Sequence, residues 1–443
     1  MNYQPVIGLE VHVELKTKSK MFCKCSADYF GHEPNTHTCP VCLGLPGALP
    51  VPNKQAIEWC IMIGAALNCE IQEFSKFDRK NYFYPDLAKG YQISQYDKPF
   101  ALNGWIEVQS EPQSKEKRKI GIRRVHMEED TGKLLHASVH GEDVSLIDFN
   151  RSGVPLVEIV TEPDFQNAFE VVQYLQKLQR IVRYLEVSNA DMEKGDMRLE
   201  PNISLRPVSS KNLPQYKVEV KNINSFKFVE KAITYEINRQ EKLLDQGETP
   251  VQETRGWDEK KNSTVSQRLK EEANDYRYFP EPDIPPIRFS KDQIGRITSQ
   301  VPELQDGKIA RFVKQFEIPE YDAEIITRER ETAEFFERAV RDGQKKVTQK
   351  QIANAIINKK PDISKMLPAE LVEQITQSVQ VEKIDESELN TIIDQVLSEQ
   401  PKAVEDYKKG KINVLMFLVG QVMKKFQKRV DPTLVKQNIE QKL

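Results

Sequence analysis

The chain has 443 residues, of which 39% are hydrophobic and 30% are charged, and its formal net charge is −3. This composition is typical of a globular protein with room for two to four domains, and the slightly acidic balance excludes a global basic field, so any polyanion site must be a local patch. No run of 18 apolar residues and no signal-peptide pattern occurs, so we expect a cytoplasmic protein without membrane contacts. Its six cysteines are then thiols or metal ligands rather than disulfides.

The first predicted element is a β-strand over residues 8–15, GLEVHVEL, where apolar and polar side chains alternate strictly. Such a strand places Glu10, His12 and Glu14 on one face. Mg²⁺ prefers oxygen ligands, and in proteins it is often bound by one or two carboxylates together with substrate phosphates. The carboxylates on this face therefore indicate nucleotide chemistry. The chain contains neither a P-loop nor the protein-kinase motifs, so ATP would bind in a different cradle. A metal-dependent hydrolase on the same acidic face is an alternative.

A loop over residues 22–43 carries two cysteine pairs, Cys23-x-Cys25 and Cys39-x-x-Cys42. Four thiolates at these spacings suit tetrahedral Zn²⁺. They fill every coordination position, so the predicted zinc is structural. Buried free thiols are the alternative.

The next stretch with a chemical signature is 77–97, where basic residues interleave with aromatic ones. Arg79, Lys80, Tyr82 and Tyr84 are of the types that bind a single-stranded nucleic-acid end, by phosphate pairing and base stacking. Aromatic residues near proline also pack ordinary cores, which is the alternative interpretation.

Three further strands are predicted at 124–130, 197–206 and 217–221, and each mixes carboxylates with basic side chains on one face. Sheets with one buried and one wet face are typically antiparallel, and a helix over 171–187 is expected to pack on the apolar side. The prolines within 283–290 indicate a boundary. We therefore expect an α+β protein with an antiparallel-sheet catalytic domain (1–289), a helical domain (290–380) and a helical tail (381–443). In the tail, a helix is predicted over 413–426, and the basic residues Lys424, Lys425, Lys428 and Arg429 cluster at its end.

Several long stretches in the first 290 residues resemble one family, the bacterial-type B subunits of the aspartyl/glutamyl-tRNA(Asn/Gln) amidotransferases. They are VIGLEVHVEL, FDRKNYFYPD, YQISQYD, HMEEDTGK, DFNRSGVPLVEIVTEPD, NISLRP, VEVKNINSF, ETRGWDE and NDYRYFPEPDIPP, and FLVGQVMKK resembles the family's tail. The resemblance implies a cradle domain similar to the glutamine synthetase and guanido kinase fold. It also implies an ATP-dependent carbon–nitrogen ligase with glutamine as amido donor, which phosphorylates the side-chain carboxylate of Glu-tRNA(Gln) or Asp-tRNA(Asn). Ammonia would come from the amidase partner, called the A subunit in this family, with the small C subunit joining the two, and the tail would bind tRNA.

The resemblance also implies roles for particular residues. Glu10, His12, Glu128 and Glu158 match the family's catalytic Mg²⁺ ligands, and Mn²⁺ is a possible substitute because a histidine is among them. Arg198 and Arg206 are the arginines we expect at the ATP phosphates. A zinc-stabilised scaffold that binds tRNA without catalysis is the alternative from another functional class.

Two departures from the family pattern stand out. The family commonly has Arg-Cys-Asp-Ala-Asn where this chain has Arg198-Leu199-Glu200-Pro201-Asn202, so Glu200 keeps a carboxylate on a longer side chain. The region around 375–390 is shorter than usual, which affects the tRNA contacts expected there more than the chemistry.

Overall fold

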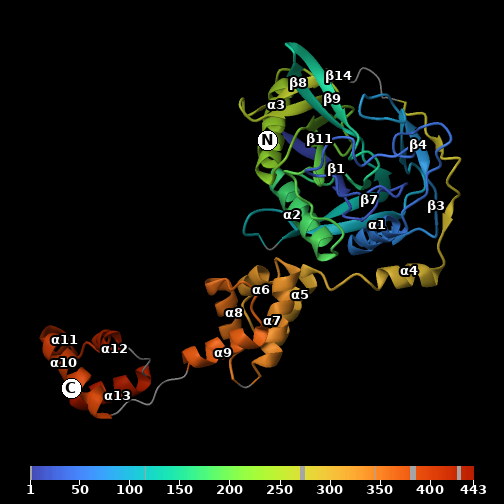
Figure 1. The fold of residues 1–443 in the computed structure, drawn as a ribbon. Coiled ribbons are helices and arrows are strands. Elements are labelled where there is room, and N and C mark those ends of the chain that lie inside the picture. Colours follow the sequence, from blue (N-terminus) through green and yellow to red (C-terminus); the bar gives the residue numbers. More distant parts are fainter. Residues whose placement is uncertain (1, 115, 270–274, 345, 380–385, 427–430) are drawn as a thin grey trace. The chain divides into compact units, whose positions relative to one another are not determined.

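The computed structural model describes residues 2–114, 116–269, 275–344, 346–379, 386–426 and 431–443. The chain divides into two compact units, Met1–Lys308 and Ile309–Leu443. The first unit is built on a large sheet and the second is helical (Figure 1). This confirms the predicted α+β class, with an antiparallel-dominated sheet followed by helices.

The sheet of the first unit has nine strands within the described residues, and all neighbours except β12 and β13 run antiparallel. In spatial order they are β14 (Ser263–Leu269), β13 (Glu253–Asp258), β12 (Val218–Lys221), β11 (Met197–Pro207), β1 (Tyr3–Glu14), β10 (Pro155–Thr161), β7 (Lys117–Glu129), β6 (Ala101–Gln109) and β2 (Glu70–Ile71). The strand predicted over 8–15 is therefore confirmed as the central strand, and those predicted at 124–130, 197–206 and 217–221 belong to β7, β11 and β12.

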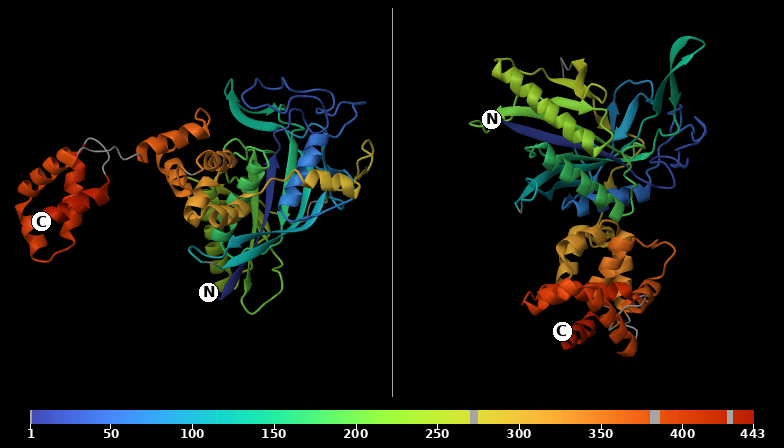
Figure 2. Two further views of the ribbon diagram at one scale, coloured as in Figure 1. Left: turned by 90° about the horizontal axis from the view of Figure 1, so that it is seen from below. Right: turned by 90° about the vertical axis from the view of Figure 1, so that its left-hand side faces the viewer.

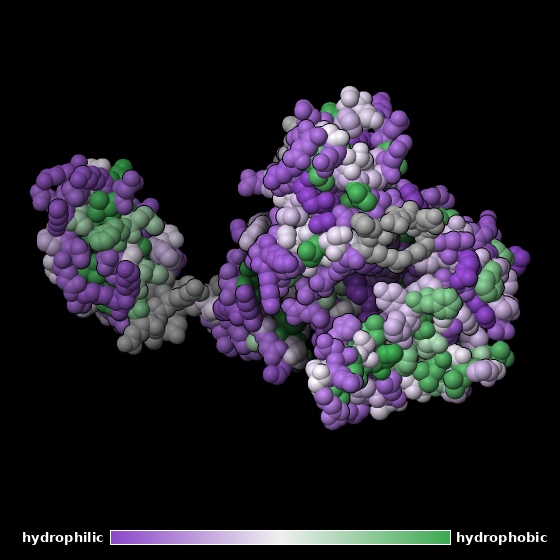
Figure 3. Space-filling view, turned by 90° about the horizontal axis from the view of Figure 1, so that it is seen from above, coloured by the Kyte–Doolittle hydropathy of each residue, from purple (hydrophilic) through white to green (hydrophobic). Residues whose placement is uncertain are grey.

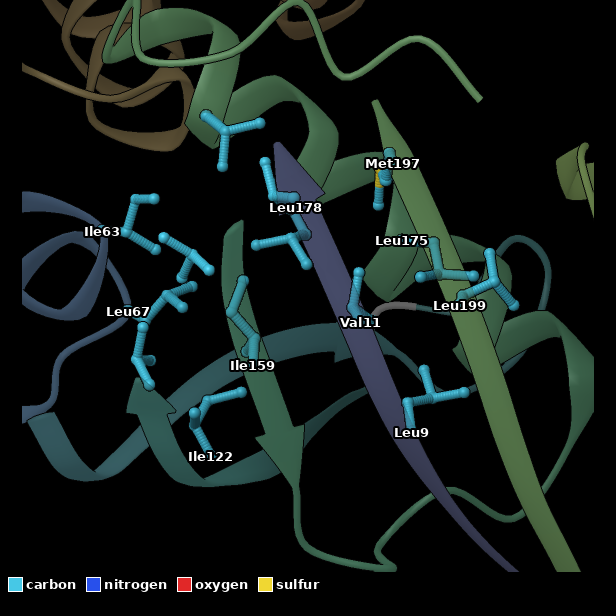
Figure 4. Packing of buried hydrophobic residues seen from close by; sticks show 14 of the residues in the cluster. Leu9, Val11, Ile63, Leu67, Ile122, Ile159, Leu175, Leu178, Met197 and Leu199 are labelled. Atoms are coloured by element: carbon cyan, nitrogen blue, oxygen red, sulfur yellow. The ribbon is translucent and has the colours of Figure 1, made fainter. Parts of the chain in front are cut away.

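One face of this sheet is covered by three helices, α1 (Lys54–Ala66), α2 (Ala168–Tyr184) and α3 (Phe226–Asp245) (Figures 1 and 2). Four side chains that β1 turns toward the helices are at most 1% exposed, namely Ile7, Leu9, Val11 and Val13. Figure 4 shows Leu9 and Val11 beside Ile159 and Leu199 of the neighbouring strands and Leu178 of α2. The alternation in the sequence arises because every second residue of these strands enters this core.

The opposite side of the sheet carries Glu10, His12 and Glu14, and we call it the polar face. Apart from the large sheet, the described residues form two small sheets and a hairpin. The small sheets are β4 (Asp78–Asn81) with β5 (Tyr91–Ser94) and β15 (Phe279–Pro280), and β3 (Phe74–Ser75) with β16 (Ile287–Arg288); the hairpin is β8 (Lys133–Val139) with β9 (Glu142–Asp148). Helix α4 (Lys291–Thr298) begins at Ser290, whose side chain and that of Gln293 form a capping box. Hydrophilic residues cover most of the surface seen in Figure 3, and hydrophobic residues gather in separate patches.

The helices of the second region form two separate hydrophobic clusters. The first involves α5 (Gln305–Phe316), α6 (Glu320–Ile326), α7 (Arg330–Asp342), α8 (Gln349–Lys359) and α9 (Pro368–Val379); the second involves α10 (Glu386–Glu399), α11 (Pro401–Lys408), α12 (Val414–Lys425) and α13 (Pro432–Lys442). Helix α12 confirms the helix predicted at 413–426. Of the four basic residues noted there, Lys428 and Arg429 lie outside the described residues, and Lys425 forms an ion pair with Glu399. Among the described residues, no helix is both long and apolar enough to cross a membrane.

Candidate active site on the polar face

Strand register sets the positions of the polar side chains, because directly opposed residues of neighbouring strands share a face. Two rows therefore run across the central strands. The first contains Arg124 (β7), Val160 (β10), Glu10 (β1) and Glu200 (β11). The second contains His126, Glu158, His12 and Arg198 on the same four strands.

His12, Glu128 and Glu158 come together in what we call the His12 cluster, with one ligand atom of each within 4.8 Å of the others. His12 Nε2 lies 3.6 Å from Glu158 Oε2, and His126 Nε2 lies 3.1 Å from the same oxygen. His126 Nε2 is also 3.5 Å from Glu128 Oε1, so this imidazole bridges the two carboxylates. One imidazole and two carboxylates are a donor set that divalent cations such as Mg²⁺ and Mn²⁺ accept.

The charges of this cluster are strongly coupled. Burial alone would raise the pKa of Glu128, but the Lys80 ammonium, 3.7 Å away, and His126 hold it at about 2. Burial opposes protonation of His12, yet its hydrogen bond to Glu158 raises its pKa to about 9. The carboxylates are therefore ionised and ready to bind a cation, and a metal bound at His12 would displace a proton.

Glu10 does not join the His12 cluster. Its ligand atom lies within 4.8 Å of Glu200 and Glu219 instead, which forms a second group, the Glu10 cluster. Burial, together with the charges of Glu158, Glu200 and Glu219, raises the pKa of Glu10. Repulsion among buried carboxylates is relieved by a bound cation. The side-chain Oδ1 of Asn202 is also buried here without a hydrogen-bond partner among the described residues, so the donor set fits a metal ion.

A pocket of about 270 Å³ opens beside the Glu10 cluster. Its lining includes Gly8, Val160, Asn202 and Lys217, as well as Glu10 itself. The pocket thus combines apolar side chains with Glu10, one carboxylate of the Glu10 cluster. A lining of apolar residues with a few polar groups suits a small ligand that has both an apolar and a polar part.

The two arginines expected at the ATP phosphates lie in different places. Arg198 is on the polar face, where Nη2 donates to Asp130 Oδ2 at 2.7 Å and Nη1 lies 3.6 Å from Glu14 Oε1. Arg206 pairs across the strands with Gln4, six residues before Glu10, and donates to the Gln4 side chain and to the Lys211 carbonyl oxygen. Six strand residues correspond to about 20 Å, so Arg206 is remote from the Glu10 row.

The four residues expected to bind a nucleic-acid end also lie in different places. Lys80 lies 3.7 Å from Glu128, and Tyr82 Oη donates to Gln92, whose amide donates to Glu128 in turn. By contrast, Arg79 forms a two-pronged ion pair with Glu281, at 2.6 and 2.9 Å. Tyr84 is 59% exposed. The structure thus connects Lys80 and Tyr82 to the His12 cluster and leaves Arg79 and Tyr84 outside it.

The four cysteines of the 22–43 loop also converge, with their Sγ atoms within 4.8 Å of one another. Cys39 and Cys42 have Sγ atoms 3.8 Å apart, close to the roughly 3.8 Å that Zn–S bonds of about 2.3 Å give in a tetrahedron. A hydrogen bond from Cys23 lowers the pKa of Cys42 to about 5, and nearby Lys20 contributes to the shift. The Lys20 ammonium is buried beside Cys42, and the Cys39 backbone N–H lies 3.1 Å from Cys42 Sγ, so both favour the thiolate form of Cys42. These donors fit Zn²⁺.

Three residues of the candidate site were not among the predicted ligands: His126, Glu200 and Glu219. Each was visible in the sequence as a polar position on an alternating strand. What the sequence lacked was the register that places Glu200 opposite Glu10, and Glu219 opposite Asn202 on the next strand. Tyr276 and Tyr278 were also missed. Tyr276 lies near Lys80, with its ring centre 5.2 Å from the ammonium.

Comparisons with known proteins match nearly the whole chain. A family model described as the GatB/GatE catalytic domain matches residues 5–295, and one described as the GatB domain matches residues 332–443. Similar curated proteins are named as the B subunit of aspartyl/glutamyl-tRNA(Asn/Gln) amidotransferase. Those of Caldanaerobacter subterraneus subsp. tengcongensis (47% identical), Persephonella marina (46%) and Carboxydothermus hydrogenoformans (45%) cover 100% of this chain and are themselves covered over 99–100% of their length. The alignments span 484 or 485 positions, more than the 443 residues here, so these relatives contain segments that this chain lacks.

Proposed function

Because the chain belongs to the family of aspartyl/glutamyl-tRNA(Asn/Gln) amidotransferase B subunits, we propose that it activates a misacylated tRNA for amide formation at the expense of ATP. The substrates would be Glu-tRNA(Gln), Asp-tRNA(Asn) or both. One observation carries the proposal. Two clusters that each suit a cation lie on the polar face, and a pocket opens beside one of them.

Each cluster would hold a divalent cation. His12, Glu128 and Glu158 supply the donors of one, and Glu10, Glu200 and Glu219 those of the other. Mg²⁺ bound there would screen the repulsion between ATP and the anionic carboxylate and neutralise charge on the phosphates. The chain's own part is to hold the carboxylates of the His12 cluster ionised, through Lys80 and the two histidines.

The reaction that this arrangement supports is a phosphoryl transfer followed by an acyl transfer. A side-chain carboxylate oxygen of the tRNA-bound amino acid attacks the γ-phosphorus of ATP, and the bond to the bridging oxygen breaks with its electron pair, releasing ADP. Ammonia then attacks the carbonyl carbon of the acyl phosphate, loses a proton and expels inorganic phosphate, leaving the amide. Phosphoryl transfer depends chiefly on positioning and on charge neutralisation, which a rigid sheet provides.

The pocket beside Glu10 would take the base and ribose of ATP. Gly8 lines it where the backbone of β1 passes, and Lys217 supplies a cation at its edge. The phosphate chain would then run over Glu10 toward the second row of the polar face. The aminoacyl end of the tRNA would approach from the side of Lys80 and Tyr82, because those residues connect to the His12 cluster from β4 and the segment after it.

The proposed reaction also needs partner proteins, because it consumes ammonia. The amidase partner, a glutaminase, would release ammonia from glutamine, and a small third protein of the complex would join the assembly. Zn²⁺ at the four cysteines would be structural, since four thiolates leave no open position.

The helical tail, α10 to α13, is proposed to bind tRNA. Lys424 and Lys425 occupy the last turn of α12, and phosphate contacts of this kind weaken steeply with salt. Because Lys425 is paired with Glu399, Lys424 is the better residue to test. In the full complex, Lys424→Glu should weaken tRNA binding and reduce its salt dependence, without changing glutaminase activity. Unchanged tRNA affinity would contradict this role.

A transamidation assay with the reconstituted complex tests the proposal directly. Each misacylated tRNA is supplied with glutamine, with and without ATP, and correctly charged tRNA serves as the matched control. We expect amide formation and ATP cleavage only with ATP and a misacylated tRNA. ATP-independent turnover would favour a hydrolase, and tRNA binding without ATP cleavage would favour a scaffold.

A further inference from the structure

Arg124 of β7 is a cation on the polar face that no described acidic side chain neutralises. Its Nη1 makes a single long contact, 3.4 Å, to the Tyr96 carbonyl oxygen. Its Nε is buried and has no hydrogen-bond partner among the described residues. A guanidinium offers five donors in a planar fork, so Arg124 retains most of its capacity to bind an anion.

Three other cations near the two clusters are already paired with carboxylates, whereas Lys217 is an exposed residue of the pocket lining. Arg198 is held by Asp130 and Glu14, Lys221 lies 3.0 Å from Glu200, and Lys80 lies 3.7 Å from Glu128. To bind a new anion they would first have to leave a partner in a part-buried environment, which opposes the change. Arg124 has no such partner to leave among the described residues.

The position of Arg124 relative to the pocket is set by the sheet. Arg124 stands directly opposite Val160, and Val160 stands directly opposite Glu10. Glu10 and Val160 both line the pocket, so the pocket reaches β10, the strand that pairs with β7 at Arg124. The Cα atoms of Arg124 and Glu10 are two strand spacings apart, about 10 Å. That interval accommodates a phosphate with a cation on one side and a guanidinium on the other, since these contacts are about 2.1 Å and about 2.8 Å long.

Arg124 also lies close to the His12 cluster. It is two residues from His126 on β7, so both side chains belong to the polar face. His126 Nε2 in turn lies 3.5 Å from Glu128 Oε1 and 3.1 Å from Glu158 Oε2. Arg124 is therefore a near neighbour of this cluster along its own strand.

We propose that Arg124 is a catalytic residue that binds the phosphoryl group in transfer. This rests on the proposed function. As the carboxylate oxygen attacks the γ-phosphorus and ADP departs, charge on the three equatorial oxygens is neutralised by the guanidinium, which donates two parallel hydrogen bonds. Arg124 gives up no proton and forms no covalent bond. Its contribution is made in the transition state more than in ground-state binding of ATP.

The first test measures ATP cleavage that depends on misacylated tRNA, in the reconstituted complex. Arg124→Ala should lower kcat by about 10³-fold or more, as loss of a transition-state arginine does elsewhere, while the KM for ATP changes by less than about threefold. Arg124→Lys should recover part of the rate, and added guanidinium ion should partly rescue Arg124→Ala. Lys119→Gln is the matched control, because it removes a cation from the same strand where Lys119 lies over Trp105. It should keep the parental rate.

The second test separates transition-state binding from folding and nucleotide binding. In the parent complex with misacylated tRNA and Mg²⁺, fluoroaluminate should tighten inhibition by ADP, because it mimics the phosphoryl group in transfer. Arg124→Ala should lose at least 100-fold of that tightening while binding ADP alone with parental affinity. Equal losses for ADP and for ADP with fluoroaluminate, or a parental rate in Arg124→Ala, would overturn the assignment. Absence of tRNA-dependent ATP cleavage in the parent complex would instead overturn the proposed function, and the inference with it.

Discussion

The cysteine cluster and the His12 cluster are both suited to a metal, yet they are assembled in opposite ways. The four thiols come from one loop of about twenty residues and fill every position of a tetrahedron. The His12 cluster draws its three donors from β1, β7 and β10, and a pocket opens beside its neighbour, the Glu10 cluster. We therefore propose that a metal at the first cluster holds a loop and that the second cluster acts on a substrate. Four variants test that contrast, from the largest expected effect to the smallest.

Glu158→Gln should have the largest effect, because this carboxylate contacts both His12 and His126 and is one of three donors. We expect tRNA-dependent ATP cleavage to fall by about 10³-fold or more, an effect of the size seen when a charge stabiliser is removed. Glutaminase activity in the amidase partner should persist. The measurement is ATP cleavage in the reconstituted complex, with circular dichroism to confirm folding. A folded Glu158→Gln complex with parental turnover would remove the His12 cluster from the mechanism.

Replacing Cys39 and Cys42 together by serine should act on stability and leave the chemistry unchanged. Loss of zinc should cost about 3 kcal/mol of folding free energy, a decrease in Tm of roughly 6 to 12 °C for a domain of this size. The fraction that remains folded should keep its turnover. Zinc content and thermal melting are the measurements. A parental Tm, or a parent protein without zinc when purified under reducing conditions, would contradict the structural role.

Glu219→Gln tests whether the Glu10 cluster holds a cation of its own. The amide keeps the hydrogen bond from Thr254 but removes one charge from the cluster. We expect the KM for ATP to rise about tenfold at low Mg²⁺, which corresponds to about 1.4 kcal/mol, and to recover as Mg²⁺ is added. Titrating Mg²⁺ at fixed ATP makes the measurement. If Glu219 only supports the sheet, Tm will fall and the Mg²⁺ dependence will not change.

Tyr29→Phe should have the smallest effect, and it tests the connection between the two regions. Tyr29 belongs to the cysteine loop, and its hydroxyl donates to Glu14 Oε2 of β1 at 2.9 Å. Removing this bond should cost about 1 to 2 kcal/mol, or a few degrees of Tm, because the buried Glu14 carboxylate loses a donor. A double-mutant cycle with Glu14→Ala, which removes the acceptor, isolates the interaction. Strictly additive effects would show that the loop and β1 are energetically independent here.

Sequence patterns predicted the strands and their faces well, because the period of two is a local property. Leu9 and Val11 are buried, and Glu10 and His12 lie on the opposite side, as the alternation of residues 8–15 predicts. The grouping of Glu10 could not be read in the same way. It depends on which residues of β11 and β12 stand beside it, and register is set by the packing of the whole sheet. The cysteine cluster needed no register, since its spacing lies within one loop.

The central position of β1 has a consequence for the order in which the protein can form during translation. Its two partners, β10 and β11, follow it by about 150 and 190 residues. At ribosomal rates of about 5 to 20 residues per second, β1 waits roughly 7 to 30 s for β10 and roughly 10 to 40 s for β11. The cysteine loop that follows β1 has all four thiols within seconds, so a zinc-closed loop can form while the strand is still unpaired. In the nascent chain, an apolar strand edge is therefore exposed for most of the synthesis of the first unit, and this is the interval in which a chaperone would be most useful to it.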